Sequence, residues 1–183
     1  MEKVLVVVYS RTGHSLRLAR RLCGRLQWPL GHIQDALPRR GALGSLRCLG
    51  DSLLRRRPPI DYLGPPPREF DLVVLVGPVW AARLAGPLRS FIAGSAATLP
   101  DIAVISVASS GGVAGAVAEA QALAHRTPRL ACAFAPAEID DGSCLPRLLA
   151  FAHALRRAGR APRRPHPAPW QTAGAPLQGT HSP

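Results

Sequence analysis

Two short segments of this chain, residues 4–8 and 72–76, are apolar at every position, and a third, residues 102–107, is apolar except at Ser106. A strand without polar positions has to be covered on both faces, as parallel strands in α/β proteins are. A helical pattern follows each of the three segments. We therefore expect strands and helices to alternate along the chain, which gives a doubly wound parallel sheet with right-handed crossovers.

Two weaker segments, Leu30–Ile33 and Leu130–Ala135, bring the expected number of strands to five. The mixed composition of the first of them predicts an edge position in the sheet. Five helical patterns are present. They lie at about 13–27, at 43–54, in a short stretch that starts at residue 86, in a stretch that starts near residue 112 and ends at about 125, and at about 145–157. The sequence thus predicts an α/β fold with three layers, in which a five-stranded parallel sheet lies between helices.

The segment 38–69 is the least regular part of the predicted domain, and its proline pairs and runs predict a surface crossover. Within it, Gly50-Asp51-Ser52-Leu53 spells the signature of a family of serine esterases. We reject that interpretation, because the serine falls inside a helical pattern and no aspartate has a histidine three residues later. Residues 159–183 lack periodicity and are rich in Pro, Ala, Arg and Gly, which predicts a disordered tail after a domain of residues 1–158.

The composition fits one globular domain, since the chain has 183 residues, of which 47% are hydrophobic. No apolar run approaches the roughly 20 residues of a membrane span, and the N-terminus lacks a signal-peptide layout, so we expect a cytoplasmic protein. The cysteines are scattered without metal-like or redox spacing, which predicts free thiols and no metal. They are Cys23, Cys48, Cys132 and Cys144.

The formal net charge is +12 at pH 7, and Lys3 is the only lysine among 23 basic residues. A basic protein can bind nucleic acid, an anionic membrane or an acidic partner. The arginines are spread over several predicted elements and lack the interleaved aromatic residues of a base-stacking surface. We therefore interpret them as a solvated basic face and expect no binding to nucleic acid.

The segment Val4–Ser15 leads from the first predicted strand through a short turn into the first helix. Backbone N–H groups and the positive end of the helix dipole converge at such a turn, which suits an anion such as a phosphate. Ser10, Thr12 and Ser15 add hydroxyl groups, and the turn carries no acidic residue. The alternative is an ordinary turn in which Thr12 or Ser10 caps the helix, and this segment alone leaves both interpretations open.

Two further turns with distinctive residues follow the other two predicted buried strands: Gly77-Pro78-Val79-Trp80-Ala81 and Ala108-Ser109-Ser110-Gly111-Gly112. The carboxyl ends of parallel strands meet at one edge of the sheet, where open α/β proteins bind their ligands. We expect the three turns to form one site. Other nucleotide-binding motifs, the G-x-G-x-x-G turn and the Walker lysine, are absent from the sequence.

Together the three turns resemble those of the flavodoxin family, and the resemblance extends over nearly all of residues 4–157. It implies the strand order 2-1-3-4-5 and a site for FMN. The first turn is similar to the family's Ser/Thr-x-Thr-Gly-x-Ser/Thr phosphate loop. The implied phosphate contacts are the hydroxyls of Ser10, Thr12 and Ser15 and the backbone N–H groups of Arg11, Gly13 and His14.

The resemblance assigns the other two turns to the flavin ring. The second turn is similar to the loop that flanks the isoalloxazine, which implies contacts from Pro78, Val79, Trp80 and Ala81. The third resembles the loop on the other side of the ring, which implies contacts from Ser109, Ser110, Gly111 and Gly112. A solvent-facing position is the simpler alternative for His14, and Asp140 and Asp141 are expected to cap the final helix.

The function implied by the resemblance is electron transfer through the flavin. We expect an NAD(P)H-dependent oxidoreductase acting on a quinone or another small acceptor, without a catalytic acid/base pair or nucleophile. The alternative is an electron carrier that docks on redox partner proteins. Family carriers are strongly acidic, so the basic charge and the Pro-Val-Trp run favour the enzyme. A third alternative is a flavodoxin-like fold that has lost its cofactor, but the hydroxyl groups of the first turn argue against it. Assembly into a homo-oligomer is left open.

Overall fold

The computed structural model describes residues 2–36, 54–109 and 111–158. Its strands are β1 (Val4–Tyr9), β2 (Leu30–Asp35), β3 (Ile60–Leu63), β4 (Leu72–Trp80), β5 (Arg83–Leu84), β6 (Asp101–Val107) and β7 (Ala131–Phe134). Its helices are α1 (His14–Leu26), the 3₁₀ turn η1 (Pro67–Glu69), α3 (Gly86–Ser95), α4 (Val113–Ala124), α5 (Pro136–Asp140) and α6 (Leu145–Ala158). Residues 43–53 of the predicted helix at 43–54, the Gly50–Leu53 motif, Cys48 and the tail 159–183 lie outside the described residues.

The strands form one seven-stranded sheet in the order β3-β2-β1-β4-β6-β7, with β5 paired to β4. β1, β2, β4, β6 and β7 run parallel, whereas β3 pairs antiparallel with β2 and β5 antiparallel with β4. The predicted α/β class with a mostly parallel sheet is confirmed. The predicted five-stranded, all-parallel sheet of order 2-1-3-4-5 is wrong, because two antiparallel strands are added; the five predicted strands lie within the sheet as β2-β1-β4-β6-β7.

The added strand β3 also removes β2 from the edge position that we predicted for it. Ile60 and Tyr62 pack on the core while Asp61 and Leu63 are exposed, so the strand has the alternation of a half-buried edge strand. Prolines precede and follow these four residues, and for that reason we predicted a surface crossover here and no strand. Proline is compatible with such a position, because an edge strand leaves N–H groups unpaired.

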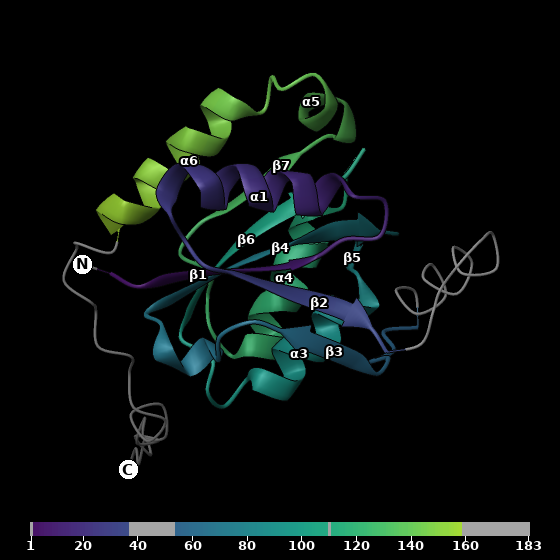
Figure 1. Cartoon of the computed structure of the whole chain (residues 1–183). Coiled ribbons are helices and arrows are strands. Elements are labelled where there is room, and N and C mark those ends of the chain that lie inside the picture. The colour runs from purple at the N-terminus through teal and green to yellow at the C-terminus, as the bar shows by residue number, and fades with distance from the viewer. Residues whose placement is uncertain (1, 37–53, 110, 159–183) are drawn as a thin grey trace, which may run out of the picture.

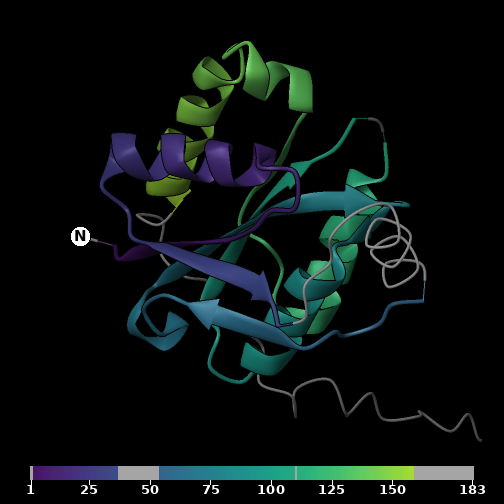
Figure 2. The same cartoon turned by 45° about the vertical axis from the view of Figure 1, so that its right-hand side comes forward.

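Helices cover both faces of the sheet, with α1, α5 and α6 on one face and α3 and α4 on the other (Figures 1 and 2). Alternate residues of β1 divide between two cores: Val6 packs with Leu22 and Leu148 of α1 and α6, and Val7 with Ile92 of α3. Every residue of β1 is buried, which confirms that the apolar segments are covered on both sides. This packing holds the turns after β1, β4 and β6 at the same edge of the sheet.

In the part of the chain that the structure describes, no helix is both long enough and apolar enough to cross a membrane. Cys23, Cys132 and Cys144 are free thiols, as predicted. Burial raises the pKa of Cys23 to about 11 and that of Cys132 to about 12. Burial thus favours the neutral form of both thiols near pH 7.

Candidate functional site

The turn between β1 and α1 presents a helix N-terminus that no side chain caps. Gly13 is the N-cap residue, and its φ of 94° lies in the left-handed region that glycine adopts most easily. Ser10 does not cap the helix; its Oγ accepts a hydrogen bond from the Gly13 N–H at 3.2 Å. The capping alternative is therefore wrong, and among the described residues no side chain is seen to accept from the first-turn N–H groups, which lack intrahelical partners. The first turn also contains no acidic residue.

The three hydroxyl residues of this turn differ in exposure. Thr12 is exposed and Ser10 is half-buried, whereas Ser15 is only 2% exposed. Arg11 is half-buried beside them. Thr12 and Ser10 are thus accessible to a ligand at the turn, while Ser15 lies beneath it on the inner side of α1.

A polar network adjoins the start of α1 and includes a carboxylate that sequence reasoning did not place there. Thr12 Oγ1 lies 2.9 Å from His14 Nδ1, and His14 Nε2 lies 3.2 Å from Asp140 Oδ2. Arg17 forms an ion pair with the same Asp140 carboxylate. His14 is thus contacted at both ring nitrogens, and its side chain remains 25% exposed to solvent. Arg17 offsets the negative charge that Asp140 brings to the helix N-terminus.

The side chains of Asp140 and Asp141 bond to α1 and to Ser143, respectively, and not to the first turn of the final helix α6 as predicted. Asp140 is the last residue of α5, and its carboxylate is held by α1. Asp141 Oδ1 accepts the Ser143 N–H at 2.8 Å, and this hydrogen bond lowers the pKa of the Asp141 carboxyl. The short helix α5 was not predicted, and it is what carries Asp140 across to α1.

The second predicted turn is instead the end of a long strand and a tight hairpin. Residues 78–80 continue β4, and Trp80 pairs with Arg83 of β5 across the hairpin. Ala81 and Ala82 form the two-residue turn with φ values of 48° and 57°. Two positive φ values are what tight hairpins require, usually met by Asn-Gly. Pro78, Val79 and Trp80 are half-buried, and Ala81 is exposed at the tip.

Trp80 lies against β1, which links the second turn to the first. Its ring meets the Tyr9 ring edge-on, with centroids 6.2 Å apart and an interplanar angle of 88°. The Tyr9 hydroxyl donates to Asp35 Oδ2 of β2 at 2.9 Å. Sequence reasoning missed Tyr9, because its position at the end of a buried strand gave no sign of this contact.

The third turn touches the tip of the hairpin. Gly112 begins α4 with a φ of 85°, and a Cβ added to it would lie 2.5 Å from the Ala82 Cα. Only glycine fits this contact. Ser109 and Gly111 are exposed beside it, and Ser110 lies outside the described residues. The turns after β4 and β6 therefore form a continuous surface beside the uncapped end of α1.

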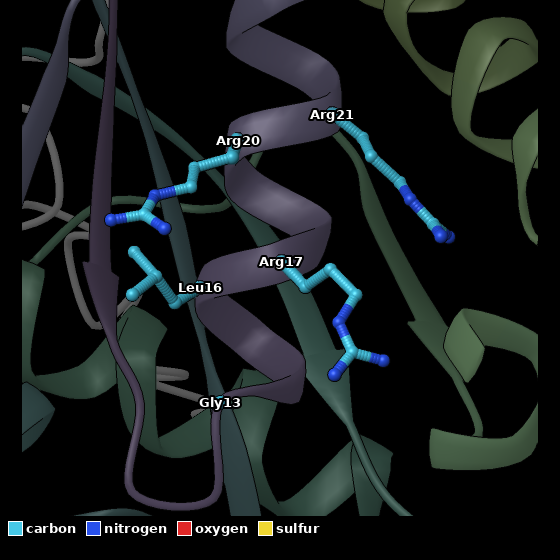
Figure 3. Close-up of a pocket in the computed structure, with 5 residues that line it drawn as sticks. All are labelled: Gly13, Leu16, Arg17, Arg20 and Arg21. Carbon is cyan, nitrogen blue, oxygen red and sulfur yellow. The ribbon is translucent and has the colours of Figure 1, made fainter.

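A cavity of about 480 Å³ lies along the outer side of α1. It is lined by Gly13, Leu16, Arg17, Arg20 and Arg21 (Figure 3). Arg17 is engaged by Asp140, and Arg21 donates to the Ile139 carbonyl at 2.7 Å. Of the predicted site residues, Gly13 alone borders this cavity. We therefore do not count the cavity as part of the three-turn site. Among the described residues, no cluster of His, Cys, Asp and Glu is suited to hold a metal ion.

No protein-family model matches this sequence, and no curated protein matches it. Solved structures do match. A flavoprotein from Lactobacillus acidophilus NCFM, solved in complex with FMN, is 18% identical with a TM-score of 0.61, over 78% of this chain and 99% of that one. A protein from Bacteroides eggerthii DSM 20697 is 17% identical with a TM-score of 0.65, over 83% and 99% of the two chains. The apo form of an NADH:FMN oxidoreductase, EMOB, is 16% identical with a TM-score of 0.50, over 94% and 100%. At these identities the similarity shows the fold.

Proposed function

We propose that this chain is an FMN-binding redox protein whose three turns after β1, β4 and β6 hold the cofactor. The observation that carries the proposal is the uncapped, glycine-initiated N-terminus of α1 beside the Trp80 hairpin. The fold supports it, because one structural neighbour was solved with FMN and another is an NADH:FMN oxidoreductase.

The residues present fit the two chemically different parts of FMN. A phosphate dianion suits a helix N-terminus with neutral donors, here the first-turn N–H groups with the Ser10 and Thr12 hydroxyls. The Asp140 carboxylate, which adjoins this terminus, is paired with Arg17. A planar apolar ring suits the half-buried indole of Trp80 and the contiguous surface of Ala81 and Gly112. Val79, Pro78, Ser109, Ser110 and Gly111 complete the proposed ring-binding set.

When bound, FMN supplies the ability to take up a hydride or single electrons and to pass them on. The chain's own groups would bind and orient it. The α1 terminus would fix the phosphate end, and the Tyr9–Asp35 hydrogen bond would keep the Tyr9 ring, and with it Trp80, in place. Gly112 would let the hairpin and the third turn stay in contact, which closes one side of the site against water.

Within this proposal we favour an NAD(P)H-dependent reductase of a quinone or another small acceptor. With FMN and a soluble quinone, the full chain is expected to oxidise NADH or NADPH continuously, measured as the loss of absorbance of the reduced nucleotide. The control is the same concentration of free FMN without protein. Oxidation that needs a second protein would instead support the electron-carrier alternative, and no oxidation with either nucleotide would contradict the reductase.

A further inference from the structure

A second cavity, of about 410 Å³, lies on the other side of the sheet from α1, between β5, α4 and the segment that precedes β3. Arg55, Arg57 and Arg83 line one side of it. The opposite side is the apolar surface of α4, formed by Ala118, Ala122 and Leu123. β5 and α4 are neighbours in Figure 1. None of these residues belongs to the proposed flavin site.

A buried ion pair forms the floor of this cavity and holds its walls together. Arg89 Nε donates to Glu119 Oε1 at 2.9 Å, and the two side chains are only 2% and 10% exposed. Arg89 also donates to the carbonyls of Leu84 at 3.0 Å and Arg56 at 2.9 Å, while Glu119 accepts the Leu84 N–H at 3.0 Å. One ion pair therefore fixes α3, α4, β5 and the Arg55–Arg57 segment relative to one another.

The charges around this cavity do not balance. Glu119, its acidic lining residue, is already neutralised by Arg89. For Arg55, Arg57 and Arg83, the described part of the chain offers no carboxylate within ion-pair distance. Three arginines thus line one preformed cavity without an ion-pair partner among the described residues, and guanidinium is the group best suited to bind phosphate oxygens in pairs. Two of the three arginines that line the cavity along α1, Arg17 and Arg21, are by contrast engaged by residues of α5.

We propose that this cavity binds a small organic phosphate of nucleotide size. The arginines would hold the phosphate groups, and the apolar surface of α4 would contact the uncharged part of the ligand. A volume of about 410 Å³ lies within the range of small-molecule sites and exceeds what an inorganic phosphate would fill. The proposal does not rest on FMN binding, since the cavity and the α1 terminus share no residue.

The probe is ADP, titrated into the full chain by calorimetry in the presence of saturating FMN, so that the α1 terminus is blocked. We expect saturable binding of ADP, weaker binding of inorganic pyrophosphate and none of adenosine. Arg57→Gln and Arg83→Gln should each weaken ADP binding about tenfold or more, because each removes a charge-assisted contact to phosphate. Arg68→Gln, an exposed arginine on η1, is the matched control and should leave the affinity unchanged.

Three outcomes would overturn the proposal: no saturable ADP binding, equal binding of adenosine, or unchanged ADP affinity in both Arg57→Gln and Arg83→Gln. Pyrophosphate binding as tight as ADP would overturn the organic part of the assignment. A titration of Gly13→Asp without FMN separates this proposal from the flavin site. Its ADP affinity should equal that of the unsubstituted chain, whether or not the flavin proposal holds.

Discussion

Replacing Glu119 by alanine is expected to lower the free energy of unfolding by about 3–5 kcal/mol, because a buried guanidinium would lose its carboxylate. Arg89 is 2% exposed and makes two hydrogen bonds to Glu119, so little water can take the place of that partner. The substitution also removes the acceptor of the Leu84 N–H and loosens β5. Domains of this size have about 5–15 kcal/mol of stability in total, so the effect is large. Urea unfolding followed by circular dichroism measures it.

The matched control is Asp140→Ala, which breaks an ion pair with Arg17 in which both side chains are about half exposed. Exposed pairs contribute about 0–1 kcal/mol, since water and salt screen them. Glu119→Gln retains the size of the side chain and one acceptor, and should fall between the two. A loss of less than about 1 kcal/mol in Glu119→Ala would contradict the structural role that we assign to the buried pair.

Replacing Gly13 by aspartate is expected to weaken FMN binding about 100-fold or more, because a carboxylate would stand where the phosphate binds and like charges in contact cost several kcal/mol. The residue's φ of 94° adds backbone strain to any side chain. Fluorescence titration with FMN measures the affinity. Gly13→Ala separates the effect of backbone strain from the effect of the added charge. A Cβ at this position meets nothing within 4 Å, so the FMN affinity of Gly13→Ala should change much less than that of Gly13→Asp.

A second control places the same new charge elsewhere on the helix. Gly24 is exposed near the other end of α1, and a Cβ there is also unobstructed. Gly24→Asp should bind FMN as the unsubstituted chain does. If Gly13→Asp, still folded by circular dichroism, kept its affinity within about threefold, the phosphate would not lie at the α1 terminus.

The sequence predicted those parts of the fold whose signal is local. β1, β4 and β6 were identified because a strand that is apolar at all or nearly all positions has to be buried on both faces. The alternation in β3 is equally local, but the prolines on both sides of it hid a strand of four residues. We missed the hairpin of β4 and β5 for two reasons. Gly77-Pro78 is typical of the end of a strand, and the Ala81-Ala82 turn lacks the usual Asn-Gly sequence.

The contacts that complete the candidate site join residues far apart in the chain. Asp140 meets His14 across 126 positions, and Glu119 meets Arg89 across 30. No spacing rule connects such pairs, since they depend on how α5 packs near α1 and α4 near α3. The first turn was predictable because a strand, a glycine and a helix are consecutive there. The position of Trp80 against Tyr9 was not, because it follows from the register of β1 with β4.

Titration of the purified full chain with FMN is the most direct test of whether the three turns form an FMN site. Flavin fluorescence should be quenched to saturation at one FMN per chain, with a dissociation constant of about 1 μM or below and a shifted visible absorption band. Free FMN mixed with an unrelated protein of similar charge is the control. Unchanged fluorescence and an unshifted absorption spectrum at about 100 μM protein would show that the three turns do not bind FMN.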